Sequence, residues 1–182
     1  MSKLVNSIRE AIALSGLKDG MTVSFHHHLR NGDFVLNMVM DEIAKQGIRD
    51  LTVNASSLFD VHAPLLNHIE NKVVTGLAAD YISAGLGRAI SQGILDNPVQ
   101  FRTHGGRPKD IALGRTPIDV AFIAAPAADN MGNASGKFKR SDPVLVEIAV
   151  YGKRCLHAEC IGSSIARLHR NAPDVLNEDS AI

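Results

Sequence analysis

The sequence contains no tryptophan, and aromatic residues make up only 4% of its 182 residues. Proteins that bind single-stranded nucleic acid commonly stack bases on aromatic side chains. An excess of basic charge could attract nucleic acid without aromatic residues, but this chain has none. Its 19 Lys and Arg balance 19 Asp and Glu and leave a formal net charge of zero. The shortage of aromatics and of excess basic charge therefore argues against nucleic-acid binding.

Cysteine and long apolar runs are scarce as well. Cys155 and Cys160 are the only cysteines, too few for a disulfide framework, so we expect the reducing cytoplasm as the compartment. No apolar run approaches the 18 residues of a membrane span. Residues 1–10 mix charges and lack the apolar segment of a signal peptide. The sequence predicts a cytoplasmic protein that binds no membrane.

Small aliphatic residues dominate what is present. The hydrophobic content is 45%, mostly Ala, Val, Ile and Leu, which is typical of α/β proteins with helices packed on a sheet. The length suits one domain, or one domain with an appendage.

Strand and helix patterns alternate up to about residue 125. Apolar spacing predicts helices over 3–16, 34–45, 64–70 and 81–92, and strands over 21–25, 48–55, 73–77, 99–103 and 119–125. Asp33 is the expected N-cap of the second helix and Gly47 its C-terminal stop. The alternation predicts an α/β fold with a mostly parallel sheet flanked by helices on both sides.

The character of the chain changes after Gly136, where basic residues become more frequent. We therefore divide the chain into an α/β domain over 1–136 and a divergent tail over 137–182. A strand over 144–150 and a helix over 161–169 are expected within the tail.

Three loops follow the carboxyl ends of expected strands. They span His26–Asp33, His104–Pro108 and Pro126–Gly136, and the loop containing Ser57 lies at the same edge. Ligands of parallel α/β sheets bind at this edge. We therefore expect the loops to share one cleft.

The side chains of these loops suit an anion. The first loop combines three histidines and Arg30 with a helix N-terminus, where free N–H groups attract carboxylates and phosphates. Glycines let the backbone approach a ligand, and Arg107 can hold a carboxylate through two parallel bonds. The candidate binding residues are His27, His28, Asn31, Gly32, Ser57, His104, Gly105, Gly106, Arg107, Asp129, Asn130 and Asn133.

Other interpretations stay open or are weaker. The turn at His104–Arg107 can be a plain surface turn, and residues 129–136 a solvated loop. A metal site would need His62, Asp60 or His104 beside the histidine run, and the spacing matches no known metal pattern. No G-x-S-x-G motif is present, and Gly85-Leu-Gly87 lacks the full dinucleotide pattern. We predict no metal.

Several segments together resemble the alpha subunit of bacterial citrate lyase. They read GLKDGMTVSFHHHLRNGD, LNMVMD, HAPLLNHIENKVVTG, PVQFRTHGGRP and IDVAFIAAPAADNMGN, and the resemblance runs over about residues 8–136. It implies a CoA-transferase-like α/β fold, of which the chain would hold the first half only.

The resemblance also implies an activity and partners. Citrate would replace acetate on the thioester of an acyl carrier protein, giving citryl-carrier and acetate. The subunit itself would bind no cofactor and would act on the phosphoribosyl-dephospho-CoA group of the acyl carrier (gamma) subunit, beside a beta subunit. No glutamate nucleophile is evident, so direct exchange would rely on positioned cations. His26 and Arg30 are the expected catalytic residues.

Family members are several times longer, and the residues after Gly136 depart from the family's pattern. We therefore expect a fragment. The alternatives are a non-catalytic module that binds an anion or the acyl carrier and, less favoured, a metal-dependent enzyme that uses the histidine run.

Overall fold

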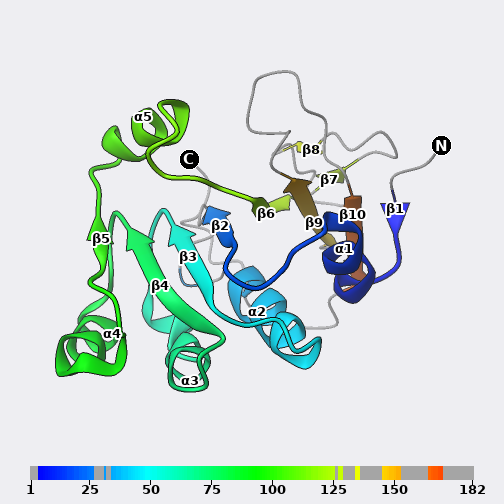
Figure 1. Ribbon diagram of the computed structural model, residues 1–182. Coiled ribbons are helices and arrows are strands. Elements are labelled where there is room, and N and C mark those ends of the chain that lie inside the picture. Colours follow the sequence, from blue (N-terminus) through cyan, green and yellow to red (C-terminus); the bar gives the residue numbers. More distant parts are fainter. Residues whose placement is uncertain are drawn as a thin grey trace.

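The computed structural model describes residues 4–26, 31, 34–125, 127–128, 134–135, 145–152 and 164–169. Its centre is an eight-stranded sheet with the order β1-β10-β9-β6-β2-β3-β4-β5 (Figure 1). The strands are β1 (Leu4–Val5), β2 (Thr22–His26), β3 (Leu51–Ala55), β4 (Val74–Ala79), β5 (Gln100–Phe101), β6 (Val120–Ala125), β9 (Leu145–Gly152) and β10 (Ser164–His169). A separate antiparallel pair joins β7 (Ala127–Ala128) to β8 (Ala134–Ser135).

Five neighbouring strands of the sheet, β6-β2-β3-β4-β5, run parallel. This confirms the expected α/β class with a mostly parallel sheet. The strand β9 runs antiparallel to both β6 and β10, and β1 runs parallel to β10. The strands beyond Gly136 thus extend the same sheet.

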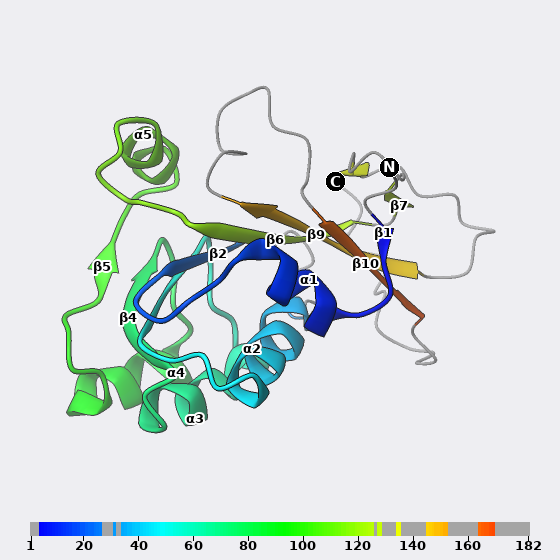
Figure 2. The same ribbon diagram turned by 45° about the vertical axis from the view of Figure 1, so that its right-hand side comes forward.

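The α-helices are α1 (Ile8–Ser15), α2 (Val35–Lys45), α3 (Leu65–Glu70), α4 (Ala84–Ala89) and α5 (Gly106–Ala112), with shorter helical turns η2 (Asp60–His62) and η3 (Ile90–Ile94). In Figure 2, α1 to α4 gather on one side of the sheet. The chain steps from β2 to β5 in one direction across the sheet, and right-handed crossovers then place their helices on one face. The expected layers on both faces are therefore not formed by these four helices.

The core lies between this helix layer and the sheet. Alternate residues of the parallel strands face it, and each is at most 2% exposed: Val23, Phe25, Leu51, Val53, Ala55, Leu77, Ala79, Val120 and Phe122. The rings of Phe25 and Phe122 stack with centroids 5.6 Å apart. Stacked aromatic pairs add about 0.5–1.5 kcal/mol beyond their burial.

The opposite face of the parallel strands is polar or small. Two rows cross it, Thr22–Thr52–Gly76 and Ser24–Asn54–Ala78. On the strand β6, Ala121 and Ile123 are only partly buried. Polar residues on this face were not recognised in the sequence.

Several element boundaries differ from the sequence-based predictions. The first helix begins at Ile8, where Ser7 Oγ accepts the N–H of Glu10 at 3.1 Å, and this Ser-x-x-Glu signal is visible in the sequence. The N-cap of α2 is Phe34 and not Asp33. Gly47 has φ +78° directly after α2, as expected of a helix stop.

The tail contains the clearest error. Residues 164–169 form the strand β10 and not a helix. Six residues of β10 pair with β9 on one side, and β1 pairs on the other. Ladder pairing on both sides overrides the local helical spacing, because strand formation depends strongly on tertiary context.

The segment expected as one helix over 81–92 also differs. Ile82 forms a parallel bridge with Leu58, so α4 begins only at Ala84, after Ser83. The chain continues through η3 to Ile94, with Gly93 at φ +88° outside helical geometry.

The chain returns from β5 across the sheet to β6, on the other side of β2. The two neighbours of β2 thus lie on opposite sides of it: β3, which follows it in the chain, and β6, which the chain reaches only after β5. The strand order therefore reverses at the carboxyl end of β2. Such a switch point is where open α/β sheets bind ligands. No helix of the described residues is long and apolar enough to cross a membrane.

Candidate functional site

The helix α5 lies beyond the carboxyl ends of β3 and β4 (Figure 1). The residues expected as a loop over His104–Pro108 are thus partly helical, since α5 begins at Gly106. Thr103 Oγ1 accepts the N–H of Gly106 at 2.9 Å, and Pro108 lies in the first turn, where its missing N–H does no harm. Arg102 Nε lies 2.8 Å from Asp110 Oδ2 and ties α5 to the end of β5.

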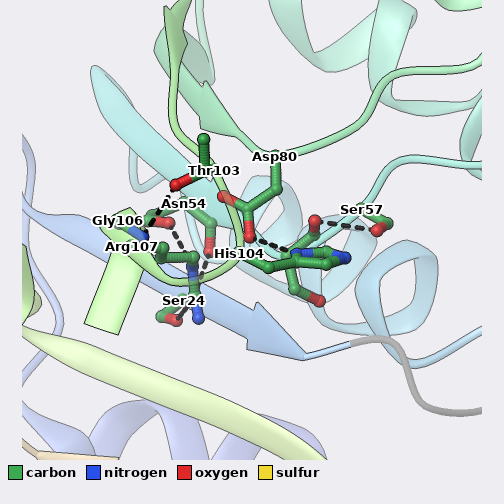
Figure 3. Close-up of polar contacts among 9 residues, drawn as sticks. Ser24, Asn54, Ser57, Asp80, Thr103, His104, Gly106 and Arg107 are labelled. Carbon is green, nitrogen blue, oxygen red and sulfur yellow. Dashed lines mark hydrogen bonds and ion pairs between the residues drawn. The ribbon is translucent and has the colours of Figure 1, made fainter. Parts of the chain in front are cut away.

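Arg107 reaches from α5 to two strands of the sheet (Figure 3). Its Nε donates to Asn54 Oδ1 at 2.9 Å, and its Nη2 donates to Ser24 Oγ at 2.7 Å. Burial of the guanidinium lowers the pKa of Arg107 below its ordinary value, and the negative charge of Asp80 opposes that shift. Two donor groups that we assigned to a ligand carboxylate thus bind the protein itself.

The bond between Arg107 and Ser24 shows how the Gly-Gly-Arg segment lies relative to the histidine loop. Ser24 lies two residues before His26 on β2, so the Gly-Gly-Arg segment and the start of the histidine loop lie at the same edge of the sheet. The expected neighbourhood of these two segments is therefore present. The roles of their residues toward a ligand stay predictions.

A carboxylate and an imidazole meet beside Arg107. Asp80 follows β4 directly, and its side chain is only 3% exposed. Its Oδ2 lies 2.8 Å from Nδ1 of His104, whose own side chain is 78% exposed. The pair presents an accessible ring that is held by a buried acid (Figure 3).

The other predicted residues of the described chain are spread around this edge. His26 is exposed at the end of β2, and Asn31 is exposed. Ser57 donates its hydroxyl to the carbonyl of Ser56 at 2.8 Å. Gly105 is the N-cap of α5. Other predicted residues lie outside the described residues: His27, His28, Arg30, Gly32, Asp129, Asn130 and Asn133.

Sequence reasoning missed three residues of this site. Ser24 and Asn54 hold Arg107, and Asp80 holds His104. Ser24 and Asn54 are polar residues that alternate with buried apolar residues on β2 and β3, and Asp80 comes directly after β4. Those interruptions were the available signal, because buried polar side chains need partners. Within the described ranges, no group of three His, Cys, Asp or Glu side chains is arranged to hold a metal ion.

A model of the family described as "Citrate lyase, alpha subunit (CitF)" matches residues 1–149, most of the 182-residue chain. The chain belongs to the citrate lyase alpha subunit family. The match extends beyond Gly136, where the resemblance seen in the sequence ended, and includes part of β9.

Curated relatives in this family agree with the match. The chain is 51% identical over 134 residues to the citrate lyase alpha chain of Haemophilus influenzae and to that of Escherichia coli K12. These alignments cover 74% of the chain and 27% and 26% of the relatives. The chain therefore spans about a quarter of the length of the relatives it matches, which supports the interpretation as a fragment.

A crystal structure described as the alpha subunit of citrate lyase from Streptococcus mutans, in complex with citrate, also matches. The two share 52% sequence identity with a TM-score of 0.75, over 78% of this chain and 28% of the other. This likeness supports the CoA-transferase-like fold expected for the first half of a family member.

Proposed function

We propose that this chain takes part in acyl exchange between citrate and an acyl carrier thioester, as the alpha-subunit component of a citrate lyase complex. Family membership supports this role, as does the citrate bound in the Streptococcus mutans relative. The observation that carries the proposal is the bond between Arg107 and Ser24. It brings the Gly-Gly-Arg segment beside the strand that leads into the histidine loop.

The proposed partners are the carrier (gamma) subunit, with its phosphoribosyl-dephospho-CoA arm, and the beta subunit. The cytoplasmic location expected from the sequence belongs to the same proposal. The chain itself would bind no further cofactor. The domain division at Gly136 also stays a proposal, with activity depending on segments found in the longer relatives.

The exchange needs no protein nucleophile. A citrate carboxylate oxygen attacks the acetyl carbonyl carbon, the C–S bond breaks, and the carrier thiolate leaves with its electron pair. The thiolate then attacks the citryl carbonyl carbon of the resulting anhydride, the C–O bond breaks, and acetate leaves. His26 and Arg30 are the proposed cations that position the anions, because fixed charges stabilise charge that develops during the reaction.

Citrate binding tests this proposal. We expect Arg30→Ala to weaken citrate binding by at least tenfold in isothermal titration calorimetry, since a charge-assisted bond is worth about 1.5–3 kcal/mol. Binding to the unaltered chain should also weaken as pH rises from 6 to 8, because histidine with an ordinary pKa of about 6.5 loses its charge.

Arg49→Ala is the matched control. Arg49 precedes β3, at the amino edge of the sheet, and donates to the carbonyl of Asn71. Its loss should leave citrate affinity unchanged. Equal affinity in the Arg30 variant and the unaltered chain would contradict the proposed role of the histidine loop.

The alternative of a non-catalytic module predicts a different pattern. Such a module would bind citrate or the acyl carrier without exchanging acyl groups. Mixing the chain with acetyl-carrier and labelled citrate, then measuring citryl-carrier, separates the two proposals.

A further inference from the structure

The carboxylate of Asp80 is an unusual group to bury. Its side chain is 3% exposed, and its Oδ1 is buried without a hydrogen-bond partner among the described residues. Oδ2 contacts a ring that is itself 78% exposed. A buried carboxylate is costly unless it is paired and fully hydrogen-bonded.

The surroundings of Asp80 explain only part of that cost. The carboxylate of Asp80 lies near Arg107 and raises the pKa of that guanidinium against the effect of burial. The guanidinium, however, directs its hydrogen bonds to Asn54 and Ser24 on the neighbouring strands. Hydrogen bonds from the N–H groups of a helix N-terminus, or from a directly paired arginine, would stabilise a buried carboxylate more strongly. The acid is instead directed at the imidazole.

The contact fixes which nitrogen of His104 carries hydrogen. An ionised carboxylate only accepts hydrogen bonds, so Nδ1 must donate to Asp80 Oδ2. In the neutral ring the other nitrogen, Nε2, then has a lone pair, and in the charged ring it carries a proton. Because the ring is exposed at the carboxyl edge, Nε2 is accessible to a reactant from solvent.

We propose that Asp80 is a positioning residue that holds His104 with hydrogen on Nδ1, so that His104 Nε2 passes a proton to and from the sulfur of the acyl carrier. This inference rests on the proposed exchange reaction. Asp80 touches no reactant and acts through the ring alone.

The proton balances over the two steps of the exchange. When the C–S bond of acetyl-carrier breaks, the sulfur keeps the electron pair and takes the proton of Nε2, which leaves a neutral ring. When the sulfur attacks the citryl carbonyl, Nε2 takes the proton back, and acetate leaves as the C–O bond breaks. Proton transfer by a positioned side chain typically contributes about 10²–10⁴-fold to a rate.

The first test measures the ring itself and needs no activity. The ¹⁵N chemical shifts of the His104 ring, recorded on the full chain at a pH where the ring is neutral, distinguish hydrogen on Nδ1 from hydrogen on Nε2. We expect hydrogen on Nδ1 in the unaltered chain. In Asp80→Asn we expect the Nε2–H form to increase, because an amide can donate as well as accept. Hydrogen mainly on Nε2 in the unaltered chain would overturn the inference.

The second test measures exchange between acetyl-carrier and citrate. We expect His104→Gln and Asp80→Asn to lower kcat by about 10²-fold, with the KM for citrate little changed. The double variant should be no slower than His104→Gln, since the two residues act as a unit. Asp80→Glu, which keeps the carboxylate, should recover part of the rate. An unchanged kcat in either single variant overturns the inference.

A second acid–imidazole pair provides the control. Asp41 Oδ1 lies 3.1 Å from His68 Nε2, between α2 and α3 in the helix layer. Asp41→Asn removes the same kind of contact away from the carboxyl edge and should leave kcat unchanged.

The outcomes separate this inference from the proposed function. Exchange that proceeds equally in the Asp80 and His104 variants overturns the inference and leaves the exchange reaction standing. No exchange by the unaltered chain with its partner subunits overturns the proposed function, and the ring ¹⁵N shifts then decide alone whether Asp80 positions His104.

Discussion

At the scale of single residues, the shape of the Arg107 side chain allows it to bind two neighbouring strands at once. The planar guanidinium donates to Asn54 Oδ1 and Ser24 Oγ, on two neighbouring strands, at 2.9 and 2.7 Å. A lysine ammonium is a single point charge and cannot reproduce this fork. We expect Arg107→Lys to lower the free energy of unfolding by about 1–3 kcal/mol, because it leaves a buried polar partner unsatisfied. Urea denaturation measures this change.

Arg115→Lys is the control for this prediction. The Arg115 side chain is 66% exposed, and its Nη1 lies 3.6 Å from Asp110. Exposed ion pairs of this kind contribute about 0–1 kcal/mol, so the unfolding midpoint should barely move. Similar losses in both variants would show that the fork of Arg107 is not what stabilises the fold.

At the scale of the elements, β3 and β4 approach closely on the polar face of the sheet. A Cβ added at Gly76 would overlap Thr52 Oγ1 and would lie 3.2 Å from Thr52 Cβ. We expect Gly76→Ala to destabilise the protein by about 1–3 kcal/mol, the usual cost of overpacking. Thermal unfolding followed by circular dichroism measures it.

Two variants sharpen the test of this close approach. Thr52→Ala removes the hydroxyl and the methyl group, so it should recover part of the stability lost in Gly76→Ala. Gly105→Ala places its Cβ where nothing lies within 4 Å, and it should have little effect. If Thr52→Ala recovers nothing, the steric explanation fails.

Local patterns predicted most of the elements between β2 and β6. Apolar runs located the parallel strands, and glycine located the end of α2, because these signals lie within a few residues. The strand β10 could not be predicted in this way, since its state depends on pairing with β9 and β1. The start of α1 was missed although Ser7 and Glu10 carry a capping signal.

The candidate site was predictable to a different degree. The Gly-Gly-Arg segment and the start of the histidine loop were placed at one edge correctly, because carboxyl ends of parallel strands share an edge. The partners of Arg107 and His104 were not predicted, since Asn54 and Asp80 are separated from them in sequence by 53 and 24 positions. Residues this far apart in sequence form no local pattern from which their contact could be predicted.

At the scale of the whole molecule, the parallel strands and the helix layer share one core. Phe122 is fully buried and stacks on Phe25, on the neighbouring central strand. We expect Phe122→Ala to lower the free energy of unfolding by about 3–5 kcal/mol, a large part of the 5–15 kcal/mol typical of a domain. Loss of a cooperative transition, or a strongly lowered urea midpoint, is the expected result.

Phe101→Ala is the matched control, because Phe101 lies on β5 at the end of the sheet and is 59% exposed. It should change stability by less than about 1 kcal/mol. Equal effects of the two substitutions would contradict a single core centred on β2 and β6.

The bond from Arg107 to Ser24 spans 83 positions of the chain. During synthesis, β2 leaves the ribosome long before the helix that completes its edge. The Arg107 donor for Ser24 is therefore made only after β5, with β6 the one parallel strand of this group still to follow. Capture of an anion at this edge would then require that α5 has docked on the sheet, and not merely that the first strands have formed.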